Sequence, residues 1–134
     1  METTGQAETD WALEVGQGEA EFVSVEDGTH VMKVHGPQGG THLYVAARLE
    51  GAHLRDEIEK YAYVEVEVTS PTALVSRTVN MRDVTPKDES TVELSSLYAY
   101  LDENVHGDIT VTVKIASEDK TKWASASRHF VVDD

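Results

Sequence analysis

The stretch from His35 to His42, HGPQGGTH, contains residue types that occur in phosphate loops and in metal sites. Phosphate-binding loops place their glycines between a strand and a helix, where backbone N–H groups and the helix dipole meet the anion. Here an alternating, strand-like segment follows, and the lysine and hydroxyl of a P-loop are absent. A turn with preset proline φ and a left-handed glycine needs no ligand. The sequence therefore predicts a structural turn formed by Gly36, Pro37, Gln38, Gly39, Gly40 and His42.

Histidines are concentrated in residues 30–53, and imidazole pairs bind copper, nickel or zinc. Two strands joined by the turn would bring His35 and His42 together. However, no H-x-H or H-x-x-x-H spacing is present, and alternation places His42 on the outward face of its strand with Tyr44 and Arg48. We therefore expect exposed histidines. The alternative is a copper or zinc site formed by His30, His35, His42 and His53.

A third candidate site is the segment DENVHGDI at residues 102–109, which resembles the start of a calcium loop. Its oxygen ligands would be Asp102, Asn104 and Asp108. The fifth position is His106, and Val113 replaces the glutamate that closes such a loop. Any calcium affinity would then be weak, and a β-turn before a strand explains the same residues.

Tyrosines on outward strand faces are the remaining chemical feature. Such rings stack on sugars or contact a partner protein, although they also pair across strands to stabilise a sheet. We predict a ligand-binding surface formed by Tyr44, Tyr61, Tyr63 and Arg48. No nucleophile elbow, H-E-x-x-H motif or spaced carboxylate pair is present, so no catalytic residue is assigned and we expect a protein that is not an enzyme.

Period-two alternation dominates the segments that must position these residues. Apolar residues alternate with polar or aromatic ones over residues 43–49, 61–69 and 109–115, and again over 123–132. Asp27-Gly28 is a hairpin-turn signal, residues 86–90 form a polar loop, and helix is expected only at residues 54–60 or 94–101. This pattern predicts an all-β protein, a single immunoglobulin-like antiparallel β-sandwich of about seven to eight strands.

The 134 residues suit one domain, which we place at residues 11–134 after a disordered polar leader at residues 1–10. The formal charge of −14 disfavours nucleic acid and anionic membrane surfaces as partners. The absence of cysteine excludes disulfides, thiol catalysis and zinc-thiolate sites. No apolar run approaches the roughly 20 residues that cross a bilayer, so no direct membrane insertion is expected.

Residues 13–51 resemble the opening of uncharacterised secreted lipoproteins from myxobacteria and related bacteria. The shared pattern is G-x-G-x-x-x-F, a D-G turn, G-P-Q-G-G-x-H and a strand that ends in glycine. The matching positions are Gly16, Gly18, Phe22, Asp27, Gly28, Gly36, Pro37, Gln38, Gly39, Gly40, His42 and Gly51. The tail at residues 107–134 is similar to the last hairpin of immunoglobulin-like domains in proteins of that kind.

The resemblance implies an extracytoplasmic protein in the periplasm, at the outer membrane or secreted, made from a precursor with a lipid anchor. It supplies no activity. Together with the residues, it leads us to expect a non-catalytic module of the cell envelope that binds a protein or a glycan or has a structural role, without a cofactor. Open edge strands would also allow copies to pair, and the sequence leaves the oligomeric state open.

Overall fold

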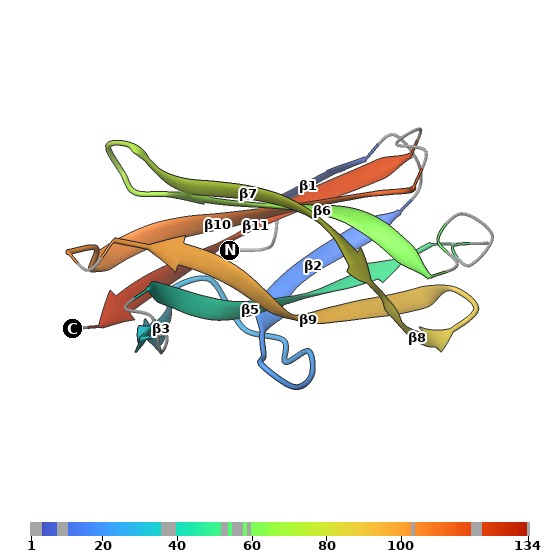
Figure 1. Ribbon diagram of the computed structural model, residues 1–134, viewed down its shortest axis with the longest axis horizontal. Coiled ribbons are helices and arrows are strands. Elements are labelled where there is room, and N and C mark those ends of the chain that lie inside the picture. Colours follow the sequence, from blue (N-terminus) through green and yellow to red (C-terminus); the bar gives the residue numbers. More distant parts are fainter. Residues whose placement is uncertain are drawn as a thin grey trace.

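The computed structural model describes residues 4–7, 11–35, 40–51, 54, 58, 60–102, 104–118 and 122–133. Over these residues the chain forms strands that build two facing sheets (Figure 1). The strands are β1 (Thr4–Ala7), β2 (Ala12–Gln17), β3 (Thr29–Met32), β4 (Val34–His35), β5 (Thr41–Glu50), β6 (Tyr61–Thr69), β7 (Leu74–Asp83), β8 (Thr85–Asp88), β9 (Thr91–Leu101), β10 (Gly107–Ala116) and β11 (Trp123–Asp133).

The first sheet, called sheet A below, has the order β1-β11-β10-β6-β7, and β3 also pairs with β11. The second, sheet B, has the order β2-β5-β9-β8, and β4 also pairs with β5. Every pairing is antiparallel except that of β3 with β11, which is parallel. The all-β, two-sheet prediction is confirmed, and the described residues contain more strands than the seven or eight expected. Four residues of the predicted leader form β1.

The core lies between the sheets and follows the predicted alternation. In β6 the buried residues are Ala62, Val64, Val66 and Val68, and in β10 they are Ile109, Val111, Val113 and Ile115. The inward residues of β5, namely Leu43, Val45, Ala47 and Leu49, are buried as well. Burial of these apolar side chains is the main favourable contribution to folding.

Residues 94–101, one of the two segments where helix was expected, belong to β9 instead. Leu97, Ala99 and Leu101 are buried and alternate with exposed Tyr98 and Tyr100, which is the period of a strand. A bulge interrupts the pairing with β5, because two serines, Ser95 and Ser96, stand opposite one residue. Ser96 has a positive φ of 55° at this point.

Three other local predictions concern residues 86–90, residues 54–60 and membrane-spanning segments. Residues 86–90 are not simply a loop, since Thr85–Asp88 forms β8 against β9. At the second expected helix, Leu54 and Ile58 are fully buried and the Ile58 N–H donates to the Leu54 carbonyl oxygen at 2.9 Å, but most of residues 54–60 lie outside the described part. No helix within the described residues is long and apolar enough to cross a bilayer.

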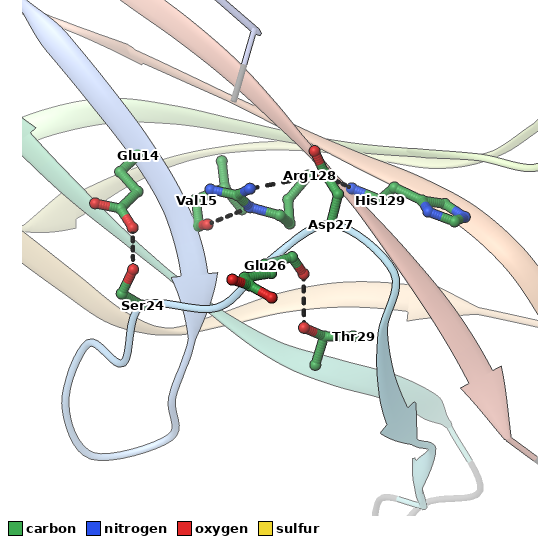
Figure 2. Close-up of polar contacts among 8 residues, drawn as sticks. All are labelled: Glu14, Val15, Ser24, Glu26, Asp27, Thr29, Arg128 and His129. Atoms are coloured by element: carbon green, nitrogen blue, oxygen red, sulfur yellow. Dashed lines mark hydrogen bonds and ion pairs between the residues drawn. The ribbon is translucent and has the colours of Figure 1, made fainter. Parts of the chain in front are cut away.

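Asp27-Gly28 forms the predicted tight turn, since the Thr29 N–H donates to the Glu26 carbonyl oxygen at 3.2 Å and Gly28 has a φ of 86°. The turn does not, however, join the two strands of a hairpin. The segment before it contributes only an isolated bridge between Val23 and Gln17, and β3 after it pairs parallel with β11. The Asp27 carboxylate instead points into the sandwich, where its Oδ1 accepts the His129 N–H at 2.8 Å and lies 3.7 Å from Nη1 of Arg128 (Figure 2). The turn therefore anchors the loop to β11.

Three glycines, Gly16, Gly18 and Gly51, lie where a side chain would meet a neighbouring group. A Cβ on Gly16 would overlap the Val23 carbonyl and lie 2.8 Å from the Phe22 ring, and a Cβ on Gly18 would overlap the Glu21 carbonyl. Gly18 also has a φ of +154°, which side chains disfavour. At Gly51 a Cβ would come within 2.6 Å of the Trp11 ring. These glycines allow close packing, with the loop after β2 folded back onto sheet B.

Candidate functional site

The four predicted ligand-binding residues do not form one surface. Tyr44 and Arg48 lie on β5, on the outer face of sheet B, whereas Tyr61 and Tyr63 lie on β6, on the outer face of sheet A. On sheet A, Lys60 places its ammonium 5.2 Å from the centre of the Tyr61 ring. Tyr63 lines a small cavity of about 180 Å³ with Lys114, Trp123 and three other residues.

Arg48 is occupied by the protein itself. Its Nε donates to Oε2 of the buried Glu93 at 2.8 Å, and the guanidinium lies 4.6 Å from the centre of the Phe22 ring. Lys87 adds a second cation 3.6 Å from Glu93. Because Glu93 is 7% exposed, these cations balance a buried charge. Arg48 therefore has a structural role in balancing Glu93, and its contact with a ligand stays a prediction.

His42 occupies the predicted outward face of β5, but the expectation that it is exposed is wrong. Only 6% of the residue is exposed, because the rings of Tyr44 and Tyr98 cover it. Its ring stacks on Tyr98 with the centres 4.5 Å apart and an angle of 24° between the planes. Nε2 of His42 is buried and has no hydrogen-bond partner among the described residues.

Four rings on the outer face of sheet B form a continuous group, which we call the tyrosine cluster: His42, Tyr44, Tyr98 and Tyr100. They are brought together by the register of β5 and β9, which sets Tyr44 opposite Tyr98 and His42 opposite Tyr100. The ring centres of Tyr98 and Tyr100 lie 5.8 Å apart, at 87°. These two residues are 40% and 42% exposed, so the cluster presents aromatic surface to solvent.

Within the cluster, Tyr44 has a shifted pKa. Desolvation raises the pKa of the Tyr44 phenol above its ordinary value of 10.0, and interactions with Tyr98 and the Glu19 carboxylate raise this pKa further. Tyr44 is therefore neutral and able to donate its O–H proton at physiological pH.

Tyr98 and Tyr100 also line a cavity of about 380 Å³ between β7, an edge strand of sheet A, and β9 of sheet B. We call it the β7–β9 slot. Its base is formed by the core residues Val64 and Val66 of β6, and the remaining lining comes from β7 and β9. The full lining is Val64, Val66, Thr78, Asn80, Met81, Arg82, Ser96, Leu97, Tyr98 and Tyr100. Its volume lies within the range of about 300–1,000 Å³ that is usual for ligand sites.

The sequence contained a signal for part of this site. Tyr98 and Tyr100 alternate with apolar residues, but the segment was also compatible with helix, so their faces were not assigned. The polar residues Thr78, Asn80 and Arg82 were not predicted as site residues, because residues 74–83 do not alternate regularly enough to assign a strand face. In the structure the apolar positions Val79 and Met81 are 57% and 43% exposed, and the polar positions face the slot.

The histidines considered for copper or zinc are separated. His30 is on β3 of sheet A and bonds Asp133 through Nδ1 at 2.8 Å, whereas His35 and His42 are on β4 and β5 of sheet B. His35 lies opposite Thr41, not opposite His42. His53 is outside the described residues. Over the residues that the structure describes, no group of three or more metal-ligating side chains comes together.

The calcium-like segment forms a turn before β10. The Val105 N–H donates to the carbonyl oxygen of Asp102 at 3.0 Å, and Gly107 has a φ of 82°. The Asn104 carbonyl oxygen bonds Nδ1 of His106, and the Asp108 carboxylate bonds Nε2 of His129 at 2.8 Å. The Asn104 carbonyl oxygen and the Asp108 carboxylate thus bond histidine side chains, and the Asp102 carbonyl oxygen bonds a backbone N–H.

Two histidine–aspartate pairs resemble part of a catalytic triad, His30–Asp133 and His129–Asp108. A triad needs a hydroxyl hydrogen-bonded to the second ring nitrogen. Within the described ranges no serine or threonine hydroxyl bonds either ring, so neither pair has the geometry of an activated nucleophile.

The predicted glycine-rich turn lies mostly outside the described residues, which exclude Gly36, Pro37, Gln38 and Gly39. Gly40 is described, and a Cβ there would meet no atom within 4 Å. The turn connects β4 with β5 and so joins antiparallel strands. No protein-family model and no curated protein matches the sequence.

Proposed function

We propose that this protein is an exported, non-catalytic binding module with an immunoglobulin-like fold, which recognises a glycan through the tyrosine cluster. The observation that carries the proposal is the exposed pair of rings, Tyr98 and Tyr100, beside a polar-lined slot of about 380 Å³. Aromatic rings offer flat apolar surface to the C–H faces of a sugar, and nearby polar groups orient its hydroxyls.

The rigidity of the cluster supports this proposal. Tyr98 is held between the His42 ring and the edge of Tyr44, so its orientation is fixed before a ligand arrives. A preordered ring loses little side-chain entropy on binding. The alternative is that these tyrosines only stabilise the sheet through cross-strand packing. That role would not require a polar cavity beside them.

The test is binding to a panel of immobilised oligosaccharides, followed by calorimetric titration of those that bind. We expect Tyr98→Ala and Tyr100→Ala each to weaken binding about tenfold, since loss of one stacked ring removes about 1.5 kcal/mol. The matched control is Tyr61→Ala, because Tyr61 is 37% exposed but lies on sheet A. Unchanged affinity in both cluster variants, or no binding to any glycan, would overturn the proposal.

A second candidate is recognition of a protein by the outer face of sheet A. It is favoured by three large exposed side chains on that face, Tyr61, Val79 and Met81, whose positions in β6 and β7 are close in register. Exposed apolar groups of this kind occur at protein contacts. Loss of ligand binding in Tyr61→Ala, with Tyr98→Ala unaffected, would favour this candidate.

The compartment belongs to the same proposal and rests on the lipoprotein resemblance of residues 13–51. We propose a precursor with an export signal and a lipid anchor. Metabolic labelling of the producing cells with a fatty-acid probe tests the anchor, and cell fractionation tests export. Unlabelled protein in the cytoplasmic fraction would contradict both.

A further inference from the structure

The inward face of β7 is polar, which is unusual for a strand that borders a core. Register with β6 sets Thr78 opposite Val66, Asn80 opposite Val64 and Arg82 opposite Ala62, so these polar residues share the inner face of sheet A with core residues. Apolar Val79 and Met81 lie opposite Glu65 and Tyr63 on the outer face, although Met81 also borders the slot. A polar side chain at the border of a core is tolerated when it has hydrogen-bond partners. For β7, some of these partners lie on β9.

Side chains of β7 bind β9 at both ends of the slot. The Ser76 hydroxyl donates to the Tyr100 carbonyl oxygen at 2.7 Å. At the other end the Arg82 guanidinium donates to the carbonyl oxygens of Ser95 at 3.2 Å and Ser96 at 3.4 Å, where the bulge of β9 presents them. These two links close the slot lengthwise. An extended peptide therefore has no free path along the edge of β9, which disfavours recognition by strand addition.

The lining of the slot has the opposite charge to the rest of the protein. The chain contains 25 acidic residues and 11 lysines and arginines, yet the slot has no aspartate or glutamate and one arginine. A comparable cavity beside Arg48, of about 440 Å³, is lined by Glu21, Glu50, Asp88 and Glu93 as well as two cations. The β7–β9 slot is thus a local positive site on an acidic protein.

Arg82 has hydrogen-bonding capacity to spare. Its bonds go to carbonyl oxygens through Nη1 and Nη2, and no carboxylate lies within ion-pair distance among the described residues. A guanidinium has five N–H donors and is always protonated. The unused donors of this half-buried group match a carboxylate, which an arginine binds in a planar, two-point geometry.

We propose that the β7–β9 slot binds a carboxylate-bearing sugar, a uronic acid residue of the glycan, with its carboxylate on Arg82. This inference rests on the proposed glycan recognition and adds its chemical class. Thr78 and Asn80 supply polar groups for the ring hydroxyls, and Tyr98 and Tyr100 supply ring surface. The net charge of −14 does not prevent this, because fields from distant charges are screened beyond about 8 Å at physiological salt.

The test compares an oligogalacturonic acid with its fully methyl-esterified form, in which neutral methyl ester groups replace the charged carboxylates. We expect the wild type to bind the acid at least about tenfold more tightly, since a charge-assisted hydrogen bond contributes about 1.5–3 kcal/mol. Arg82→Gln should remove this preference. The matched control is Arg77→Gln, because Arg77 is on the same strand but faces outward and pairs with Glu65.

Asn80→Asp keeps the test decisive if Arg82→Gln does not fold. It places a carboxylate inside the slot and leaves the links from Arg82 and Ser76 to β9 in place. We expect weaker binding of the acid and unchanged binding of the ester. Thermal unfolding of each variant confirms that the folded protein is compared.

Four outcomes would overturn the inference. Equal affinity for acid and ester, with loss of both in Tyr98→Ala, would remove the uronic acid but keep glycan recognition. If the protein binds neither the acid nor the ester but binds other glycans in a Tyr98-dependent way, the uronic acid is likewise removed and glycan recognition is kept. Arg82-dependent binding of a peptide with a free C-terminal carboxylate, but not of its amide, would replace the sugar by a peptide. Absence of all glycan binding would remove the proposed function as well.

Discussion

Two arginines reach from sheet A to backbone carbonyls of sheet B, near opposite edges of the sandwich. Arg128 of β11 donates through Nε to the Val15 carbonyl oxygen of β2 at 3.2 Å, and Arg82 of β7 donates to the bulge of β9. The two guanidinium groups differ in burial and in whether a carboxylate lies beside them. Arg128 is 5% exposed and faces Asp27 (Figure 2). Arg82 is half-buried and has no carboxylate partner in the described part of the chain.

The difference separates a structural charge from one available to a ligand. Withdrawing an ion from water costs several kcal/mol, so a guanidinium as buried as Arg128 needs a counter-ion within the protein. Arg82 borders a cavity and retains access to solvent, so a ligand can supply the missing anion. An arginine that joins two sheets therefore indicates a binding site only when its counter-charge is absent.

The largest effect is expected on the Arg128 side. Asp27→Ala should destabilise the protein by about 3–5 kcal/mol, because it leaves a buried guanidinium without its counter-ion and also removes the acceptor of the His129 N–H. The free energy of unfolding in urea measures this effect. The matched control is Glu26→Ala, one residue away and exposed, for which a change within about 0.5 kcal/mol is expected.

An equal, small loss in both variants would mean that Asp27 does not balance Arg128. The comparison between the two arginines would then fail, since neither would need a counter-ion.

A smaller stability effect is expected on the Arg82 side. Arg82→Gln should cost about 1 kcal/mol, because it removes hydrogen bonds of 3.2–3.4 Å to carbonyl oxygens and leaves no buried carboxylate unpaired. Urea unfolding under the same conditions as for Asp27→Ala provides the measurement. A loss as large as that of Asp27→Ala would show that Arg82 is a structural charge, and would weaken its assignment to a ligand.

Most of the fold could be predicted from the sequence where one strand face is apolar. Residues 61–69 and 109–115 alternate without interruption, and both are strands with buried valine and isoleucine. Alternation identifies a strand and its inward face, because the side-chain period of a strand is two. It does not identify the neighbouring strand or the sheet, which is why the parallel pairing of β3 with β11 was not foreseen.

The failures occur where polar residues face inward. Arg128 is in the buried row of β11, between Ala126 and Phe130, and its partners Asp27 and the Val15 carbonyl oxygen are distant in sequence. In β7 the outward residues are the apolar ones, so the hydrophobic pattern alone places the strand the wrong way round. Both exceptions depend on tertiary contacts that a local pattern does not contain.

The candidate site was predicted only through Tyr44. Tyr61 and Tyr63 have the same outward pattern as Tyr44, but they belong to the other sheet, and a period-two pattern gives no information about sheet membership. Tyr98 and Tyr100 join Tyr44 through the register of β9 with β5, which a bulge shifts. That register follows from pairing over long sequence separation.

The smallest expected effect concerns Tyr44, the member of the tyrosine cluster whose environment burial changes most clearly. Its folded-state pKa is raised, chiefly by desolvation and also by Tyr98 and Glu19, so the folded protein retains this proton at pH values where the unfolded chain loses it. Its contribution to stability is therefore complete below the unfolded pKa of about 10 and is lost as the pH rises through the folded pKa. We expect Tyr44→Phe to make unfolding free energy less dependent on pH above about 10. Parallel curves for wild type and variant would contradict the packing of Tyr44 against Tyr98, and with it the preordered ring surface next to Arg82.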